Sequence, residues 1–178
     1  SEFWSAAKEE MDFLLEAANM KTFSKNNENV VFVASPKLYS ELTTAQVLVM
    51  EYIDGYSVSD THTLEQEGYD LVEIGEKLAD NYVRQIMQDG FFHADPHPGN
   101  LRIRGGKIVW LDMGMMGRLT PRDKSLIAKA VKAIARGNNS ELVDVILALG
   151  IFHGKPNRIR LYTDICLLYT SPSPRDIS

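Results

Sequence analysis

Apolar residues recur at steps of three and four in several stretches of the chain, which is the spacing expected along one face of a helix. These stretches are 2–20, 70–90, 120–137 and 140–150. Thr120 precedes a proline and is followed three residues later by an acid, an order typical of a helix start. The pattern therefore predicts helices in all four stretches.

Short runs rich in β-branched residues lie between the helical stretches and predict strands. Two of them, 30–34 and 46–50, are joined by a polar connection. Two more, 101–104 and 107–111, flank a Gly-Gly pair and predict a β-hairpin. The mixture of helices and strands indicates an α+β fold.

Composition describes an ordinary soluble globular protein: 44% of the 178 residues are hydrophobic, 24% are charged and the formal net charge is −5. No apolar run approaches the roughly 20 residues needed to cross a bilayer, and no basic-then-apolar leader stands at the start. We expect a cytoplasmic location. Peripheral membrane association of a longer parent protein stays open.

Both ends of the sequence carry features of their own. The chain begins at Ser1 without a methionine and is at once in a helical pattern, so we expect its true beginning to lie upstream. Residues 166–178 look like the translation of a sequencing adapter and are set aside as a non-native tail. The only cysteine, Cys166, lies in that tail, so no disulfide, thiolate nucleophile or cysteine metal site is expected.

The candidate chemistry lies in the segment His-Ala-Asp-Pro-His-Pro-Gly-Asn at 93–100 and in an aspartate beyond the predicted hairpin. Asp95, Asn100 five residues later, and Asp112 follow the order of parts in kinase-type phosphoryl transfer. In that chemistry the first aspartate accepts the proton of the attacking hydroxyl. The asparagine and the second aspartate hold magnesium ions that bridge the nucleotide phosphates. The expected cofactors are therefore ATP and Mg²⁺.

A metal-hydrolase cluster is an alternative, because His93, Asp95 and His97 alternate and would share one side of an extended segment. Prolines interrupt that segment, and the spacings to Asn100 and Asp112 would then be coincidental. A purely structural loop is a further alternative. The pattern favours histidines that orient the loop by hydrogen bonds over histidines that bind zinc.

The substrate class follows from the short segment between Asp112 and the helix start at Thr120. A protein kinase needs a long activation segment there to carry its phosphosite and peptide platform. A small molecule, a lipid or plain ATP hydrolysis is therefore expected. The local excess of basic residues in 101–136 indicates a solvated helix face, and no nucleic-acid motif accompanies it.

These motifs resemble the UbiB family of atypical kinases, which is associated with ubiquinone biosynthesis. The resemblance rests on 93–100, on Leu-Asp-Met-Gly-Met-Met-Gly-Arg-Leu at 111–119, and on an acidic motif within 10–19. It also includes the sequence Val-Leu-Val-Met-Glu-Tyr-Ile-Asp-Gly at 47–55, which is similar to the hinge of that family. The likeness covers most of 8–150.

The resemblance implies a protein-kinase-like fold with a mostly helical C-lobe. Residues 1–53 would form a partial N-lobe, and residues 54–165 the C-lobe with the catalytic loop. By the same resemblance Asp95 is the catalytic-loop aspartate, and Asn100 and Asp112 bind magnesium.

Further roles follow from the resemblance alone. Glu16 would pair with the ATP-contacting lysine of the N-lobe. The hinge, formed by Met50, Glu51 and Ile53, would receive adenine. The acidic residues Glu10 and Asp12 would engage a lysine of an N-terminal extension that covers the site and restrains protein-kinase activity.

Two features depart from the family pattern. Met113 replaces the usual phenylalanine after the magnesium-binding aspartate, and its apolar bulk is expected to keep the packing role. The extension, the nucleotide-binding loop and the strand with the ATP lysine are not in this sequence, so we expect the fragment by itself to be inactive. A phosphotransferase of the aminoglycoside or choline kinase kind, or a regulatory pseudokinase, remains an alternative.

Overall fold

The computed structural model describes residues 12–150 and 157–170. The chain forms two compact units, of which the first ends at Arg118 and the second begins at Leu119. The expected lobe boundary at 53–54 lies inside the first unit, and the division into lobes stays a prediction. Each unit is described by itself.

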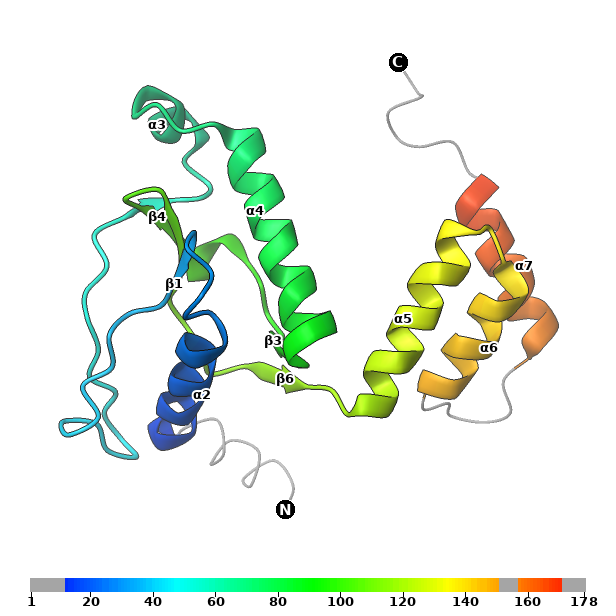
Figure 1. Cartoon of the computed structure of the whole chain (residues 1–178), viewed down its shortest axis with the longest axis horizontal. Helices are drawn as coiled ribbons and strands as arrows, with labels where there is room; N and C mark the ends of the chain where they lie inside the picture. Colours follow the sequence, from blue (N-terminus) through cyan, green and yellow to red (C-terminus); the bar gives the residue numbers. More distant parts are fainter. Residues whose placement is uncertain (1–11, 151–156, 171–178) are drawn as a thin grey trace. The chain divides into compact units, whose positions relative to one another are not determined.

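The first unit contains a four-stranded sheet, of which Figure 1 labels β1 and β4. The order of the strands in this sheet is β1-β5-β4-β2. Its strands are β1 (Val33–Ala34), β2 (Tyr56–Ser57), β4 (Leu101–Arg104) and β5 (Lys107–Trp110). β4 and β5 are antiparallel, and the two glycines between them have φ angles of 56° and 75°. The predicted hairpin is thus confirmed, since such angles suit a glycine turn.

Helices accompany this sheet: α2 (Phe13–Asn26), α3 (Thr61–Gln66) and α4 (Leu71–Arg84), the last continued by a π-helical turn at Gln85–Asp89. In Figure 1, α2 and α4 run beside the strands. The helix predicted at 70–90 is confirmed. The Asp70 side chain caps its start, and its end lies at Gly90, whose φ of 63° is left-handed.

A second, two-stranded sheet brackets the candidate chemistry. It pairs β3 (Phe91–His93) with β6 (Met116–Arg118) in antiparallel fashion. A short 3₁₀ turn, Pro98–Asn100, leads from the candidate loop into β4. The two segments that carry Asp95 and Asp112 are therefore each anchored at one end by this small sheet.

The fully buried indole of Trp110 lies at the centre of the first hydrophobic core. Its ring centroid is 6.1 Å from that of Phe23 on α2, 6.4 Å from Tyr82 on α4 and 5.0 Å from His93. Met20, Leu64, Ile103, Ile108 and Met113 are also buried in this core. One core thus joins both helices, the hairpin and the candidate loop.

The second unit consists of α5 (Pro121–Ala135), α6 (Asn139–Leu149) and α7 (Arg158–Thr170). The helices predicted at 120–137 and 140–150 are confirmed, and Thr120 and Asp123 form a reciprocal capping box at the start of α5. α7 was not predicted, and its last residues belong to the tail set aside above. Ile165 of α7 is buried against Ala133 and Val143, which accounts for its docking.

Two predictions at the start of the chain need correction. The predicted helix 2–20 is not continuous through Asp12, whose backbone is extended (φ −98°, ψ 93°) and whose side chain caps α2 by accepting from the Leu14 N–H. Residues 1–11 lie outside the described residues. The helix also continues to Asn26, beyond the predicted end.

The predicted strands 30–34 and 46–50 are also partly wrong. Only Val33–Ala34 is a strand, because the amides of Val30 and Val33 are used in turns. Residues 46–50 make isolated bridges instead, since the Thr44 hydroxyl accepts from the Val47 amide and favours a local turn over a ladder.

No helix in the described residues is long and apolar enough to cross a membrane.

The packing of Phe23 gives a stability prediction with a control in the same helix. Phe23 is 1% exposed against Trp110, whereas Phe13 is 36% exposed. Phe23→Ala should lower the free energy of unfolding of the first unit by about 3–5 kcal/mol, because it removes a large buried side chain and leaves a cavity. Urea titration followed by circular dichroism measures the loss. Phe13→Ala should lower the free energy of unfolding far less. Equal losses for the two variants would contradict the assignment of Phe23 to the core.

Candidate active site

A pocket of about 480 Å³ brings together the sequence-predicted residues of the candidate loop, α2 and the segment after β5. Its polar lining consists of Asp12, Glu16, His93, Asp95, Asn100 and Asp112. Of the two acidic residues expected to engage a lysine of the N-terminal extension, only Asp12 is described, because Glu10 lies outside the described residues. The pocket therefore joins residues that are about 100 positions apart in the sequence.

The buried His93 ring links the two segments that line this pocket. Its Nδ1 accepts a hydrogen bond of 3.2 Å from the Asp95 N–H, so the ring proton must lie on Nε2. Nε2 then donates to the Asp112 carbonyl at 2.7 Å. Burial is the main effect that lowers the pKa of His93, which favours the neutral ring that this arrangement requires.

The loop between His93 and β4 is ordered by its own polar groups. His97 Nδ1 accepts from the Gly99 N–H at 3.0 Å, and the His97 N–H donates to the Asp95 carbonyl at 2.8 Å. A Cβ at Gly99 would lie 2.7 Å from the His97 ring, so a larger residue there would have to displace this ring from its bond to the Gly99 N–H. The prediction that His93 and His97 orient the loop by hydrogen bonds is confirmed.

The zinc alternative has little support in this geometry. Both ring nitrogens of His93 already make hydrogen bonds, so neither is available to a metal without breaking one. Within the described ranges, no group of three or more His, Cys, Asp or Glu side chains is arranged to hold a metal ion.

Helix α2 clamps the segment after Asp112 through two side chains three residues apart. Glu16 Oε1 accepts from the Met113 N–H at 3.3 Å, and Asn19 Nδ2 donates to the Met113 carbonyl at 2.9 Å. Met113 itself is fully buried, in agreement with the expected packing role. Asn19 lies within the acidic motif at 10–19, but the sequence assigned it no role; its position one turn after Glu16 places it on the same helix face.

Glu16 and Asp112 form a close pair of carboxyl groups. The pKa of Glu16 is raised chiefly by burial, and further by the charge and hydrogen bonding of Asp112. Asp112 Oδ1 accepts from the Gly114 N–H at 2.7 Å, which fixes one carboxylate oxygen. No Lys or Arg in the described residues makes an ion pair with Glu16. The pair is thus a site of uncompensated negative charge.

The predicted hinge lines a separate pocket of about 460 Å³ that reaches Leu111, the residue before Asp112. Met50, Glu51 and Ile53 all contribute to it. Glu51 is tied down: its side chain accepts from the Lys37 N–H at 3.1 Å and from Arg104 at 2.9 Å. These two bonds, the Lys37 amide first, lower the pKa of Glu51.

The backbone of the hinge leaves specific groups for a ligand. The Glu51 N–H donates to the Lys37 carbonyl at 2.8 Å and is unavailable. In contrast, neither the Glu51 carbonyl nor the Ile53 N–H makes a hydrogen bond to the described part of the chain. An acceptor and a donor thus lie two residues apart beside the pocket.

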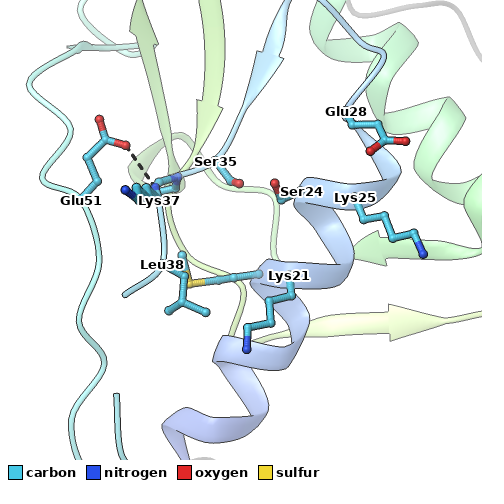
Figure 2. A pocket seen from close by; sticks show the side chains of 10 residues that line it. Lys21, Ser24, Lys25, Glu28, Ser35, Lys37, Leu38 and Glu51 are labelled. Atoms are coloured by element: carbon cyan, nitrogen blue, oxygen red, sulfur yellow. Dashed lines mark hydrogen bonds between the residues drawn. The ribbon is translucent and has the colours of Figure 1, made fainter. Parts of the chain in front are cut away.

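A larger hollow, about 530 Å³, is lined by α2, residues 35–38 and Glu51 (Figure 2). Lys21, Lys25 and Lys37 line it, but Figure 2 shows the Lys21 and Lys25 side chains diverging, so they do not converge on one anion. Since it also lacks the Asp95 loop, its size does not make it the candidate site.

The oxygen donors of the first pocket suit magnesium, which prefers carboxylate and amide oxygens. The Asn100 amide is oriented by a long bond of 3.4 Å from its Nδ2 to the Asp95 carbonyl, which leaves Oδ1 as a ligand atom. Asp112 is a second oxygen donor, held by its bond to the Gly114 N–H and by its contact with Glu16. The residues present therefore fit the expected ion.

Comparison with known proteins identifies the family of the chain. Residues 1–146 match the model of the ABC1 atypical kinase-like domain. The chain belongs to this family. The resemblance to UbiB kinases is therefore confirmed, and a kinase-like phosphotransferase is supported at the level of the family.

Relatives of this ABC1-family chain occur in bacteria and plants. It is 40% identical over 168 residues to the "Uncharacterized protein in hydrogenase 1 5'region" of Clostridium pasteurianum, covering 94% of this chain and 32% of the relative. It is 34% identical over 150 residues to ACTIVITY OF BC1 COMPLEX KINASE 8, a chloroplastic protein of Arabidopsis thaliana, covering 83% of this chain and 20% of the relative. The chain thus spans about a third or less of these relatives.

A solved structure shares the fold of the ABC1-family chain. The erythromycin complex of Rv3197 from Mycobacterium tuberculosis matches with a TM-score of 0.67 and 22% identity, over 95% of this chain and 43% of that one. The expected α+β, protein-kinase-like fold is confirmed.

The Glu16–Asp112 pair predicts a pH dependence of stability in metal-free buffer. Because the folded pKa of Glu16 is raised, its contribution is present at low pH and is lost as the pH rises from the ordinary value of 4.5 through the folded value. Thermal unfolding across this range, compared between the wild type and Glu16→Gln, measures this contribution, because the lowered pKa values of Glu51 and Asp60 change stability in the opposite direction. Glu16→Gln should lack the decline that Glu16 contributes, since a neutral amide can still accept from Met113.

The matched control is Glu41→Gln, which alters an exposed carboxylate in a loop and should leave the decline unchanged. A Glu16→Gln variant with the same pH profile as the wild type would contradict the assigned pair.

Proposed function

We propose that this chain carries the catalytic-loop and magnesium-binding part of the ATP site of an atypical kinase or ATPase. The observation that carries the proposal is the single pocket that Asp95, Asn100, Asp112 and Glu16 line together. These residues come from three separate segments, and the order of the first three matches phosphoryl transfer.

Asp95 is the proposed proton acceptor. Its side chain is 56% exposed and stands on a loop stiffened by Pro96 and Pro98, so an attacking hydroxyl or water can reach it. Asn100 and Asp112 would hold magnesium, which neutralises phosphate charge when bound. Little covalent work is left to the protein in this chemistry, and positioning these oxygens is its main task.

Adenine is proposed to bind at the hinge. The Glu51 carbonyl would accept from the exocyclic amine of adenine, and the Ile53 N–H would donate to a ring nitrogen. Both groups make no hydrogen bond within the described residues. Met50 and Leu111 line the same pocket. Leu111 also precedes Asp112, so an adenine here would place its phosphates toward the magnesium ligands.

A small-molecule or lipid acceptor, or ATP hydrolysis alone, is proposed rather than a protein substrate. The segment after Asp112 is used by β6 (Met116–Arg118), which pairs with β3, and α5 is capped by Thr120. That leaves no span for a peptide platform between Asp112 and α5. A role in isoprenoid-quinone biosynthesis, with peripheral membrane association, rests on the family resemblance alone.

This chain by itself is proposed not to turn over ATP. Glu16 has no lysine partner among the described residues, and the neighbouring charge that acts on its pKa is the carboxylate of Asp112. The proposed lysine that completes the ATP site would come from another part of a longer protein. The same holds for the lysine proposed to meet the acidic motif of Glu10 and Asp12.

The metal roles predict that nucleotide binding by the chain, though weak, depends on a divalent ion. Asp112→Asn should weaken Mn²⁺ binding in the presence of ADP by about tenfold or more, equivalent to about 1.4 kcal/mol, because it removes a charged ligand. Electron paramagnetic resonance of free Mn²⁺ measures this. Asp80→Asn, at an exposed position of α4, serves as the control.

Equal ADP affinity with and without the divalent ion would reject the ligand roles of Asn100 and Asp112.

The catalytic role of Asp95 is testable in a longer protein that contains this chain. Asp95→Asn should lower ATP turnover by about 100-fold or more, since it removes the proton acceptor but keeps the size of the side chain. Mg²⁺-ADP affinity should change little. Coupled ATPase assays measure turnover, and purified chain 1–178 should show none.

Wild-type turnover by the Asp95→Asn protein would reject the catalytic proposal and favour a regulatory pseudokinase. Magnesium-dependent ATPase activity of the 178-residue chain would reject the proposal that it is inactive by itself.

A further inference from the structure

A row of buried carboxamides lies behind the candidate loop, and the roles proposed above do not use it. Asn27, Asn81 and Gln85 are 5%, 0% and 0% exposed. Asn81 belongs to α4, Gln85 begins the π-helical turn, and Asn27 follows the last residue of α2. Buried amides of this kind are retained only where their donors and acceptors are paired.

The three amides form one directed chain of hydrogen bonds. Gln85 Oε1 accepts from the His93 N–H at 3.0 Å, and Gln85 Nε2 donates to Asn81 Oδ1 at 2.8 Å. Asn81 Nδ2 donates to Asn27 Oδ1 at 2.7 Å, and Asn27 Nδ2 donates to the Phe23 carbonyl at 3.0 Å. Every amide therefore accepts on one side and donates on the other.

The ends of the chain fix the orientation of every member. The Phe23 carbonyl can only accept, whereas the His93 N–H can only donate. A third fixed group, the Trp110 indole N–H, donates to Asn81 Oδ1 at 3.1 Å. Turning any one amide would set two N–H groups or two oxygens against each other. The chain has a single satisfied arrangement.

That arrangement ends on the backbone of His93. Gln85 holds the His93 N–H, and the Tyr82 hydroxyl, one helical turn earlier, donates to the His93 carbonyl at 2.9 Å. The His93 ring in turn binds the Asp95 N–H and the Asp112 carbonyl. A shift of His93 would therefore move both segments of the candidate site.

The π-helical turn explains how Gln85 reaches two elements. The Gly90 N–H donates to the Gln85 carbonyl five residues earlier, and Gly90 is left-handed. The chain thus reverses directly into β3 (Phe91–His93), which brings the His93 N–H back over the Gln85 side chain. π-turns inserted in helices frequently occur at functional sites.

We propose that Gln85, oriented by Asn81, is a positioning residue that sets the backbone of His93 and thereby the Asp95 loop and the Asp112 segment for magnesium-nucleotide binding. Asn27 and Trp110 fix the orientation of Asn81. The functional part of this inference rests on the proposed ATP site. The structural part, that the Gln85 amide holds the backbone of His93 in place, does not rest on the ATP site.

Gln85→Glu tests the requirement for a donor and an acceptor in one side chain. A protonated carboxyl reproduces the amide pattern, since its carbonyl accepts from His93 and its O–H donates to Asn81. An ionised carboxylate has no proton to donate, so one of its oxygens would repel the Asn81 oxygen instead of bonding to it. Protection of the His93 amide against hydrogen exchange, measured by NMR, should match the wild type at low pH. It should fall at least tenfold below the wild type at high pH.

Three comparisons make this test specific. At each pH, protection in the variant is compared with protection in the wild type. Both proteins contain the titratable neighbours His93, Tyr82 and Arg84, so titration of these groups affects both proteins equally. Gln66→Glu, at an exposed position of α3, should leave His93 protection unchanged at every pH. Ile108, whose amide donates to the Phe32 carbonyl, reports on the rest of the unit and should keep its protection in Gln85→Glu.

Gln85→Met gives a second variant that cannot be rescued by acid. It should lose His93 protection at every pH, and it should weaken Mn²⁺ binding with ADP by about tenfold, while Gln66→Met does neither. Equal losses at His93 and Ile108, or unchanged His93 protection in both Gln85 variants, would overturn the positioning role. A wild-type chain that binds no Mn²⁺ with ADP would reject the ATP site, whatever the exchange result.

Discussion

The buried imidazole of His93 is the contact on which the candidate site depends, because among the described residues it is the side chain that bonds to both aspartate-bearing segments. Nδ1 must accept from the Asp95 N–H while Nε2 donates to the Asp112 carbonyl. Only one neutral tautomer satisfies both bonds. Protonation would place an N–H at Nδ1 against the Asp95 N–H, so burial, which disfavours the charged ring, also protects the geometry.

The surroundings of His93 connect the site to the core of the first unit. Trp110 lies 5.0 Å from the imidazole and stacks at 18° with Tyr82, whose hydroxyl holds the His93 carbonyl. Phe23 also contacts the indole, with ring centroids 6.1 Å apart. The hydrophobic side chains that stabilise the unit are therefore the same ones that set the site, and a cavity in this core would be felt at the candidate loop.

Local signals explain what the sequence could predict. The Gly-Gly hairpin turn, the Thr120 cap and the Gly90 helix end each depend on a few neighbouring residues, and all three are found as expected. The strand predicted at 46–50 failed because Thr44 hydrogen-bonds the following backbone, a competition that β-propensity does not register. Asp95, Asn100 and Asp112 could be selected from their spacing, since phosphoryl transfer constrains it, and they line one pocket.

Burial, in contrast, is a tertiary property. Asn19, Asn81 and Gln85 stand in helices at positions where an asparagine or glutamine is ordinarily exposed, and apart from the one-turn step from Glu16 to Asn19 no spacing marks them as buried. Their importance follows only once the helices are packed and each amide has a fixed partner. Sequence patterns thus locate the groups that do the chemistry more readily than the groups that hold them in place.

The carboxyl pair of Glu16 and Asp112 shows how the same charges oppose stability and favour binding. Without a cation, burial and the neighbouring carboxylate both resist ionisation of Glu16, and this resistance is a cost to the folded state at neutral pH. A lysine or a divalent ion placed beside the pair would reverse the sign of that cost, because each carboxylate would then gain an opposite charge. The Met113 backbone, clamped by Glu16 and Asn19, keeps Glu16 close to Asp112 and prevents the pair from separating to relieve its repulsion. Relief of the repulsion between Glu16 and Asp112 therefore adds to the free energy with which a cation binds beside them.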